Sequence, residues 1–88
     1  MIRTIVNQYN QRTLLPHNNI IKGAVYRHYK GNLSKVINLG RHSETEETMV
    51  IYKPLDDIKG DIWIRPASMW NEQVDHNGEV VRRFVLVE

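Results

Sequence analysis

The stretch Thr-Met-Val-Ile-Tyr-Lys, residues 48–53, is the most apolar strand-like segment of the chain, and Pro54 directly follows it. Its β-branched and aromatic residues favour an extended strand. Because proline cannot donate to a strand ladder, the strand is predicted to end there. Four further segments with strand-like composition flank it: residues 24–29, 33–39, 61–65 and 80–87. Five short strands at this spacing predict an all-β fold in the form of a small, strongly bent barrel.

Short punctuating sequences separate these segments. Lys30-Gly31-Asn32 predicts a turn, and Gly40 is expected to allow a bend or a bulge late in the second strand. Residues 67–70 predict one helical turn, and Asp75-His76-Asn77-Gly78 is a hairpin signal. Trp63 lies in an Ile-Trp-Ile run inside the fourth strand. Its indole is therefore expected in the core more readily than on the surface.

The first twenty residues follow a different pattern. Apolar residues recur there at helical spacing, at Ile2, Ile5, Val6 and Tyr9. Pro16 then blocks continuation of a helix. Two interpretations remain open, a short capping helix and an arm used in dimerisation. The expected organisation is an N-terminal helical or extended arm, residues 1–20, and a barrel domain, residues 21–88.

Composition limits the possible classes of protein. The chain has 88 residues, 41% of them hydrophobic, which suits one globular domain with a modest core. Twelve basic and ten acidic residues give a net charge of +2, which is too balanced for a strong electrostatic claim on nucleic acid, although the pI near 9.1 leaves this possibility open. The acidic clusters argue against a uniform basic face for duplex DNA. The absence of cysteine excludes disulfides and thiolate zinc sites. No apolar run is long enough for a signal peptide or a membrane span, so a cytoplasmic protein without a membrane partner is expected.

Several motifs occur in order from residue 23 to the end. They are Tyr26-Arg27-His28-Tyr29-Lys30-Gly31, His42-Ser43-Glu44-Thr45, Tyr52, Trp63-Ile64-Arg65-Pro66 and Arg83-Phe84. Together they resemble a small bacterial and phage family, the domain-of-unknown-function family 1653. The resemblance implies an SH3-like barrel and no established activity. Three residues depart from the family pattern, and one of them, Ser34, stands where an aromatic is usual and either enlarges a pocket or removes part of the core. The other two are Trp70 for a usual Phe and Arg82 for a usual Pro.

Catalysis is disfavoured. On a strand, His42 and Ser43 would point to opposite faces and could not act as a base and its nucleophile. Ser43 and Thr45 are more simply read as residues whose side chains cap a turn. A metal set of His28, His42 and Glu44 lacks any tight ligand spacing. Neither a metal nor a cofactor is therefore expected.

Binding is the better interpretation of the motif residues. Arginine forks onto phosphate or carboxylate, and aromatic faces stack on bases. Arg27, His42 and Arg65 are expected to converge on one ligand, with His42 oriented by Glu44. Structural alternatives stay open, since Trp63 can be core and Arg65 can pair with Glu44. The expected ligand-binding residues are Tyr26, Arg27, His28, His42, Ser43, Glu44, Thr45, Tyr52, Trp63 and Arg65.

The sequence is compatible with three functions. The first is non-catalytic binding or sequestration of a small anionic, nucleotide-derived ligand. If the chain is encoded by a phage, capture of a bacterial immune nucleotide signal is one purpose it would serve. The alternatives are a protein- or RNA-interaction module, since small barrels often serve as one, and a small nucleotide hydrolase. A homodimer or higher homo-oligomer is a further expectation, because the apolar stripe of residues 1–20 has no evident place in a barrel.

Overall fold

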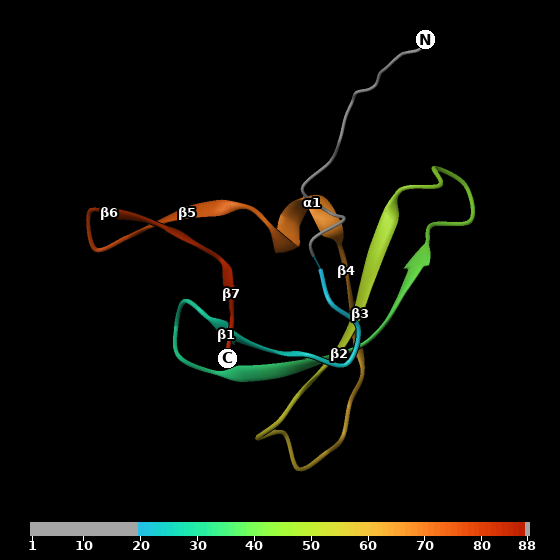
Figure 1. The fold of residues 1–88 in the computed structure, drawn as a ribbon, viewed down its shortest axis with the longest axis horizontal. Coiled ribbons are helices and arrows are strands. Elements are labelled where there is room, and N and C mark those ends of the chain that lie inside the picture. The colour runs from blue at the N-terminus through green and yellow to red at the C-terminus, as the bar shows by residue number, and fades with distance from the viewer. Residues whose placement is uncertain (1–19, 88) are drawn as a thin grey trace, which may run out of the picture.

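The computed structural model describes residues 20–87, which form a mostly β domain (Figure 1). Strands and one helical turn follow each other along this part of the chain. They are β1 (Val25–His28), β2 (Leu33–Arg41), β3 (Thr48–Pro54), β4 (Trp63–Pro66), α1 (Ala67–Trp70), β5 (Gln73–His76), β6 (Glu79–Arg82) and β7 (Phe84–Leu86). The all-β prediction is confirmed, and the turn at residues 30–32 and the helical turn at residues 67–70 are where the sequence places them.

Five strands form one antiparallel sheet in the order β4-β3-β2-β1-β7, and β5 pairs only with β6. In Figure 1 the β5–β6 hairpin projects away from the five-stranded sheet. The five-stranded sheet bends into a small SH3-like barrel whose two end strands, β4 and β7, share no backbone ladder. Side chains meet there instead, since the guanidinium carbon of Arg65 on β4 lies 5.9 Å from the centre of the Phe84 ring on β7.

A bulge in β2 contributes to this bending. Val36 pairs with Tyr52 and Asn38 pairs with Ile51, so Ile37 is an extra residue on the β2 side. A bulge bends its strand and increases the local twist. Gly40 was expected to mark this irregularity, but it pairs regularly with Met49. The bulge lies three residues earlier, at a residue whose identity gives no such signal.

The predicted last strand, residues 80–87, is in fact two strands, β6 and β7, separated by a bend at Arg83. The Arg83 N–H donates to the carbonyl of Glu72 at 2.9 Å, and the Arg83 carbonyl accepts from Tyr29 N–H at 2.9 Å. The Arg83 guanidinium also pairs with the Glu72 carboxylate at 2.9 Å. These contacts fix the base of the β5–β6 hairpin, and an apolar run alone could not reveal them.

The tip of this hairpin has the structure that its sequence predicts. Asn77 and Gly78 both adopt positive φ, 56° and 84°. Two such residues make the tight turn that matches the twist of paired strands. The Asp75 carboxylate also accepts from Gly78 N–H at 3.0 Å. The hairpin prediction at residues 75–78 is confirmed.

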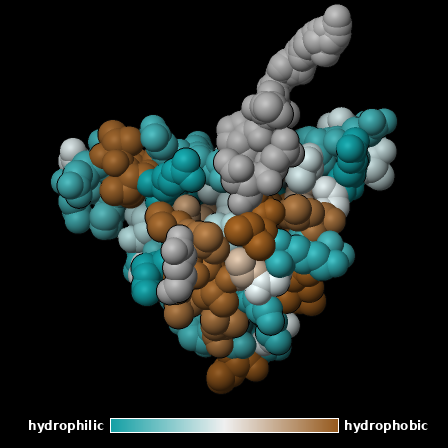
Figure 2. Space-filling model, viewed as in Figure 1, coloured by the Kyte–Doolittle hydropathy of each residue, from teal (hydrophilic) through white to brown (hydrophobic). Residues whose placement is uncertain are grey.

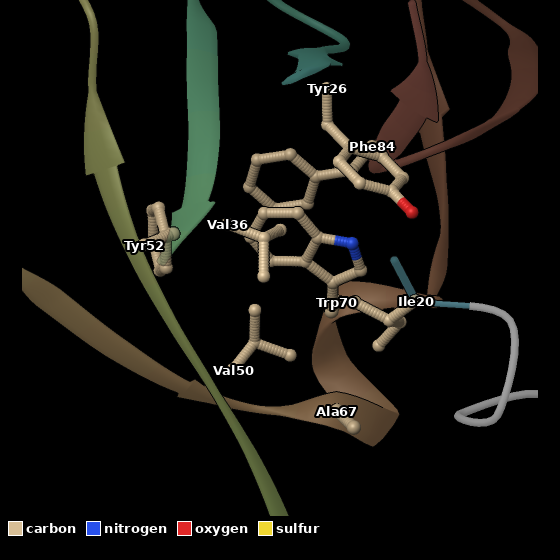
Figure 3. Packing of buried hydrophobic residues seen from close by; sticks show 8 residues of the cluster. All are labelled: Ile20, Tyr26, Val36, Val50, Tyr52, Ala67, Trp70 and Phe84. Atoms are coloured by element: carbon tan, nitrogen blue, oxygen red, sulfur yellow. The ribbon is translucent and has the colours of Figure 1, made fainter. Parts of the chain in front are cut away.

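The core is built around one indole, that of Trp70 (Figure 3). Trp70 has no exposed surface and stacks on Phe84 with 3.6 Å between ring centres and 5° between planes. Tyr26 and Tyr52 meet the same indole edge-on, at 5.3 and 5.0 Å. Smaller side chains complete the buried cluster; these are Ile20, Val36, Val50 and Ala67.

Trp63 was expected in the core, and this expectation is wrong, because the side chain is 51% exposed. It pairs with Tyr52 across β3 and β4, so it lies on the same face of the sheet as that core residue. However, β4 is at the end of the sheet order, where no further strand covers it. An end strand leaves half of this ring in solvent.

The expected helical stripe and dimerisation arm lie in residues 1–19, outside the described residues. Ile20, which the sequence assigns to the arm, is 6% exposed and packs in the barrel core. Within residues 20–87, none of the helical structure is long and apolar enough to span a bilayer.

Candidate functional site

A pocket of about 280 Å³ opens on the inner face of the sheet, near the place where β4 approaches β7. Its lining comes from all five strands of the sheet, from the β1–β2 turn and from the loop after β3. The lining residues are His28, Lys30, Asn32, Ser34, Tyr52, Pro54, Asp56, Arg65 and Phe84. We call this space the basic pocket, because three of these side chains are basic and one is acidic.

Strand alternation and register bring these side chains to one face. Residues directly opposite each other in an antiparallel pair have their side chains on the same side of the sheet. His28 is opposite Phe84 in the β1–β7 pair, and Ser34 is opposite Pro54 in the β2–β3 pair. Tyr52 lies two residues before Pro54, so its side chain also faces inward. The sheet thus supplies an aromatic floor with polar groups around it.

Arg65 bridges the two aromatic residues of this floor. Its guanidinium lies over the Phe84 ring at 5.9 Å, and its Nε donates to the Tyr52 hydroxyl at 3.5 Å, a long and weak bond. Arginine readily stacks on an aromatic face in this way while its remaining N–H groups can still donate to an anion. The stacked position therefore orients the fork without using up its donors.

His28 reports the electrostatics of the basic pocket. Its Nδ1 accepts from Lys30 N–H at 3.2 Å, and its ring packs edge-on against Phe84 at 5.0 Å. Burial lowers the pKa of His28 below its usual range, and the positive charges of Arg83, Arg65 and Lys30 lower it further. Burial is the larger cause of this pKa shift, and the neighbouring positive charges add to it, so an anion in the pocket would relieve the part that is due to repulsion.

Further polar groups line the basic pocket. Ser34 is only 4% exposed and is the buried polar residue among the residues described. A large aromatic at this position would occupy part of the space, so its place in the lining favours the enlargement alternative over simple loss of core. Asn32 Nδ2 donates to Asp56 Oδ2 at 3.2 Å, which ties the β1–β2 turn to the loop after β3.

Of the residues predicted to bind ligand, the structure brings His28, Tyr52 and Arg65 together in the basic pocket. Tyr26 faces the same interior but lies deeper, 6% exposed, and its hydroxyl accepts from Ile21 N–H at 3.0 Å. Arg27 follows Tyr26 on β1 and so points to the outer face.

The predicted segment His42 to Thr45 forms the turn between β2 and β3, and all four side chains are exposed. His42 Nδ1 accepts from the backbone N–H groups of Glu44 and Thr45, at 3.1 and 3.3 Å. Thr45 Oγ1 accepts from Glu47 N–H at 3.3 Å, which is the turn-capping role that the sequence suggests. The His42 and Thr45 side chains thus form hydrogen bonds with backbone N–H groups of their own turn.

The predicted convergence of Arg27, His42 and Arg65 is not found. His42 follows the Arg41–Thr48 pair at one end of the β2–β3 ladder, while the basic pocket adjoins the Ser34–Pro54 pair at the other end. Arg65 bonds to Tyr52 rather than to Glu44, so the structural alternative of an Arg65–Glu44 pair is not found either. Among residues 20–87, no cluster of three histidine or acidic side chains could hold a metal.

Sequence reasoning missed six lining residues: Lys30, Asn32, Ser34, Pro54, Asp56 and Phe84. Part of this set could have been predicted from the sequence, because His28 and Phe84 lie in matched motifs and Lys30-Gly31-Asn32 is the predicted turn beside His28. Asp56 gave no signal beyond an acidic loop, since its contact with Asn32 joins residues far apart in sequence.

Comparison with known proteins places the chain in a family. Residues 24–86 match the model of the family described as "Protein of unknown function (DUF1653)". A solved structure of a protein of that family, from Bordetella bronchiseptica, is similar to this chain with a TM-score of 0.70 and 36% sequence identity. The similarity covers 81% of this chain and 91% of that one. No curated protein matches. The motifs, the fold and the extent of these matches together show that the chain belongs to the domain-of-unknown-function family 1653.

Proposed function

We propose that this protein binds a small, anionic, nucleotide-derived ligand without transforming it, and that the anionic group lies in the basic pocket. One observation carries the proposal: Arg65, Lys30 and His28 line a single pocket in which Asp56 is the one acidic residue. With its pKa lowered, the His28 ring is mostly neutral at pH 7, so the positive charge of the pocket comes from Arg65 and Lys30, whose mutual repulsion an anion would relieve.

The floor of the pocket supports an organic rather than a simple inorganic ligand. Small-molecule sites are mostly apolar with a few placed polar groups. Here Phe84 and Tyr52 supply apolar surface, while Arg65 supplies a fork that is already oriented by its stacking. The volume, about 280 Å³, is at the small end of the range for ligand sites. It suits one phosphate with part of a sugar better than a whole cyclic oligonucleotide.

Sequestration remains the biological use that we propose, in the cytosol, where a chain without cysteine needs no disulfide for stability. A protein that binds its ligand without transforming it acts by holding that ligand or as a subunit of an assembly. Capture of a nucleotide signal fits the first of these uses.

The test is titration calorimetry of the protein with inorganic phosphate and with a panel of linear and cyclic nucleotides. Arg65→Ala should weaken binding by roughly tenfold to a hundredfold, since charged hydrogen bonds contribute about 1.5–3 kcal/mol each. Arg41→Ala is the matched control, because Arg41 is exposed at the far end of β2. It should leave affinity unchanged.

A melting curve of each variant separates binding from folding. Arg65→Ala removes one stacked cation and one weak hydrogen bond, which should cost about 1 kcal/mol of unfolding free energy. If the wild-type protein gives no binding heat with phosphate or any nucleotide, or if the two arginine variants bind equally well, the proposal is wrong. The interaction-module alternative would then be preferred.

A further inference from the structure

A second pocket, of about 320 Å³, adjoins the basic pocket. It is lined by Arg27, Gly31, Asn32, Leu33, Leu55 and Asp56. Asn32 and Asp56 line both pockets, and the 3.2 Å hydrogen bond between them forms a shared ridge. Arg27 and Leu33 are paired on the outer face of the sheet, so the two pockets lie on opposite sides of this ridge, and a ligand that occupies both must wrap over it.

The two pockets differ in charge. The basic pocket has two positive charges, those of Arg65 and Lys30, against Asp56, whereas the second pocket has only Arg27 against the same carboxylate. Coulomb attraction therefore favours the basic pocket for the anionic part of a ligand. The second pocket, which is nearly neutral, suits an uncharged part that carries both hydrogen-bond donors and acceptors.

The walls of the second pocket indicate the shape of that part. Leu33 and Leu55 supply apolar surface, and Leu55 is 51% exposed. Figure 2 shows hydrophobic surface on the loop between β3 and β4, at the foot of the view. Half-exposed leucines gain stability when a flat apolar ring covers them. A nucleobase offers such a ring, and its edge can be read by polar groups beside it.

Asp56 and Arg27 present opposite hydrogen-bonding characters to that edge. A carboxylate only accepts, and a guanidinium only donates. Guanine places two N–H donor positions, N1 and the exocyclic amino group, beside two acceptors, O6 and N7. Arginine pairs with O6 and N7, and a carboxylate matches the two donors. Adenine instead presents a ring nitrogen acceptor to the carboxylate, and the two lone pairs repel.

We propose that the second pocket is a base-recognition subsite that selects guanine, with Asp56 and Arg27 reading the base of a nucleotide whose phosphate lies in the basic pocket. This inference rests on the proposed function. Asn32 is a positioning residue, because its amide donates to Asp56 Oδ2 and so orients the carboxylate. That oxygen still has a lone pair for a second donor.

The experiment measures dissociation constants of the full chain for GMP, AMP and inorganic phosphate. GMP should bind at least tenfold more tightly than AMP, because guanine gives Asp56 two N–H donors where adenine presents a repelling ring nitrogen, and one hydrogen bond to a charged group already corresponds to about tenfold. Asp56→Asn should reduce this preference to about twofold or less. Asp61→Asn is the matched control, since Asp61 is an exposed acidic residue outside both pockets, and it should keep the preference.

Arg27→Ala provides an independent arm. It should weaken GMP about tenfold and leave inorganic phosphate unchanged, because phosphate alone does not reach the second pocket. Equal affinity for GMP and AMP in the wild-type protein, or a preference that survives Asp56→Asn, would overturn the inference. In either case, tight phosphate binding would leave the proposed anion site intact. Absence of binding by all three compounds would instead overturn both.

Discussion

The two tryptophans of this chain should respond very differently to truncation, and Trp70→Ala should be the most damaging single change in the barrel. Trp70 is fully buried, and three aromatic rings contact it. Removing a buried Trp costs about 3–5 kcal/mol of unfolding free energy. Because three ring contacts are lost together, we expect the upper end of this range, about 4–5 kcal/mol.

That loss is large compared with the stability of a domain of this size. At about 0.05–0.15 kcal/mol per residue, a chain of 88 residues has roughly 4–13 kcal/mol. Trp70→Ala should therefore unfold a protein at the lower end of this range, and it would remove about a third of the stability at the upper end. Trp63→Ala should cost about 1 kcal/mol or less, since half of that ring is already in solvent and its removal leaves no closed cavity.

Trp70→Phe keeps the comparison measurable if the alanine variant does not fold. Phenylalanine preserves much of the stack on Phe84 and removes the Trp70 Nε1 donor, which is buried with no hydrogen-bond partner among the described residues. We expect a loss of about 1–2 kcal/mol, smaller than the volume change alone suggests.

Urea denaturation measures these free energies, and tryptophan fluorescence gives an independent check of burial. Trp63→Phe leaves Trp70 as the single tryptophan, whose emission should be blue-shifted and protected from iodide quenching. Trp70→Phe leaves Trp63, whose emission should be red-shifted and quenchable. The reasoning fails if Trp63→Ala destabilises the protein clearly more than Trp70→Phe does, or if the two emission spectra are reversed.

Three further predictions follow from the same structure. The folded protein lowers the pKa of His28, so the unfolded chain takes up the proton first as pH falls below about 6.5, and folding loses stability there. In urea titrations, the His28→Gln variant should therefore lose less unfolding free energy between pH 7 and pH 5 than the wild-type protein does. Gly78→Ala should cost about 1 kcal/mol through its positive φ alone, since a Cβ there meets open space, whereas Gly40→Ala, the control, should cost less in the same assay. Deleting residues 1–19 should leave a folded barrel by circular dichroism but weaken self-association, and sedimentation of the full chain as a monomer at micromolar concentration would contradict the dimer.

Local patterns predicted most of the strands because their causes are local. The apolar run at residues 48–53, the Asn77-Gly78 turn and the breaks at the prolines each depend on neighbouring residues alone. The bulge at Ile37 and the bend at Arg83 depend on partners in other strands, on the β3 register and on Glu72. Neither partner can be identified from composition. The predicted position of the bulge, at Gly40, is therefore wrong, and β6 and β7 are predicted as one strand.

The site was predicted in part, and the error has a specific cause. Strand alternation already separates Arg27 from His28, because consecutive residues on a strand face opposite sides. The prediction that Arg27 and Arg65 converge ignored this alternation and relied on their common charge. Similarly, the sequence predicts that His42, oriented by Glu44, donates to the ligand, whereas its Nδ1 accepts two backbone N–H bonds and helps to form its own turn.

The position of the basic pocket follows from where the sheet does not close. Within a ladder, backbone groups of neighbouring strands satisfy each other, and inward side chains only need to fill the core. Between β4 and β7 there is no such ladder, so the approach of the two strands is mediated by Arg65 and Phe84. A cation held against a ring in this gap keeps donors available that a buried arginine would lose to structural partners. The same open edge that leaves Trp63 half exposed therefore gives the barrel a place where a charged side chain can face both the core and a ligand.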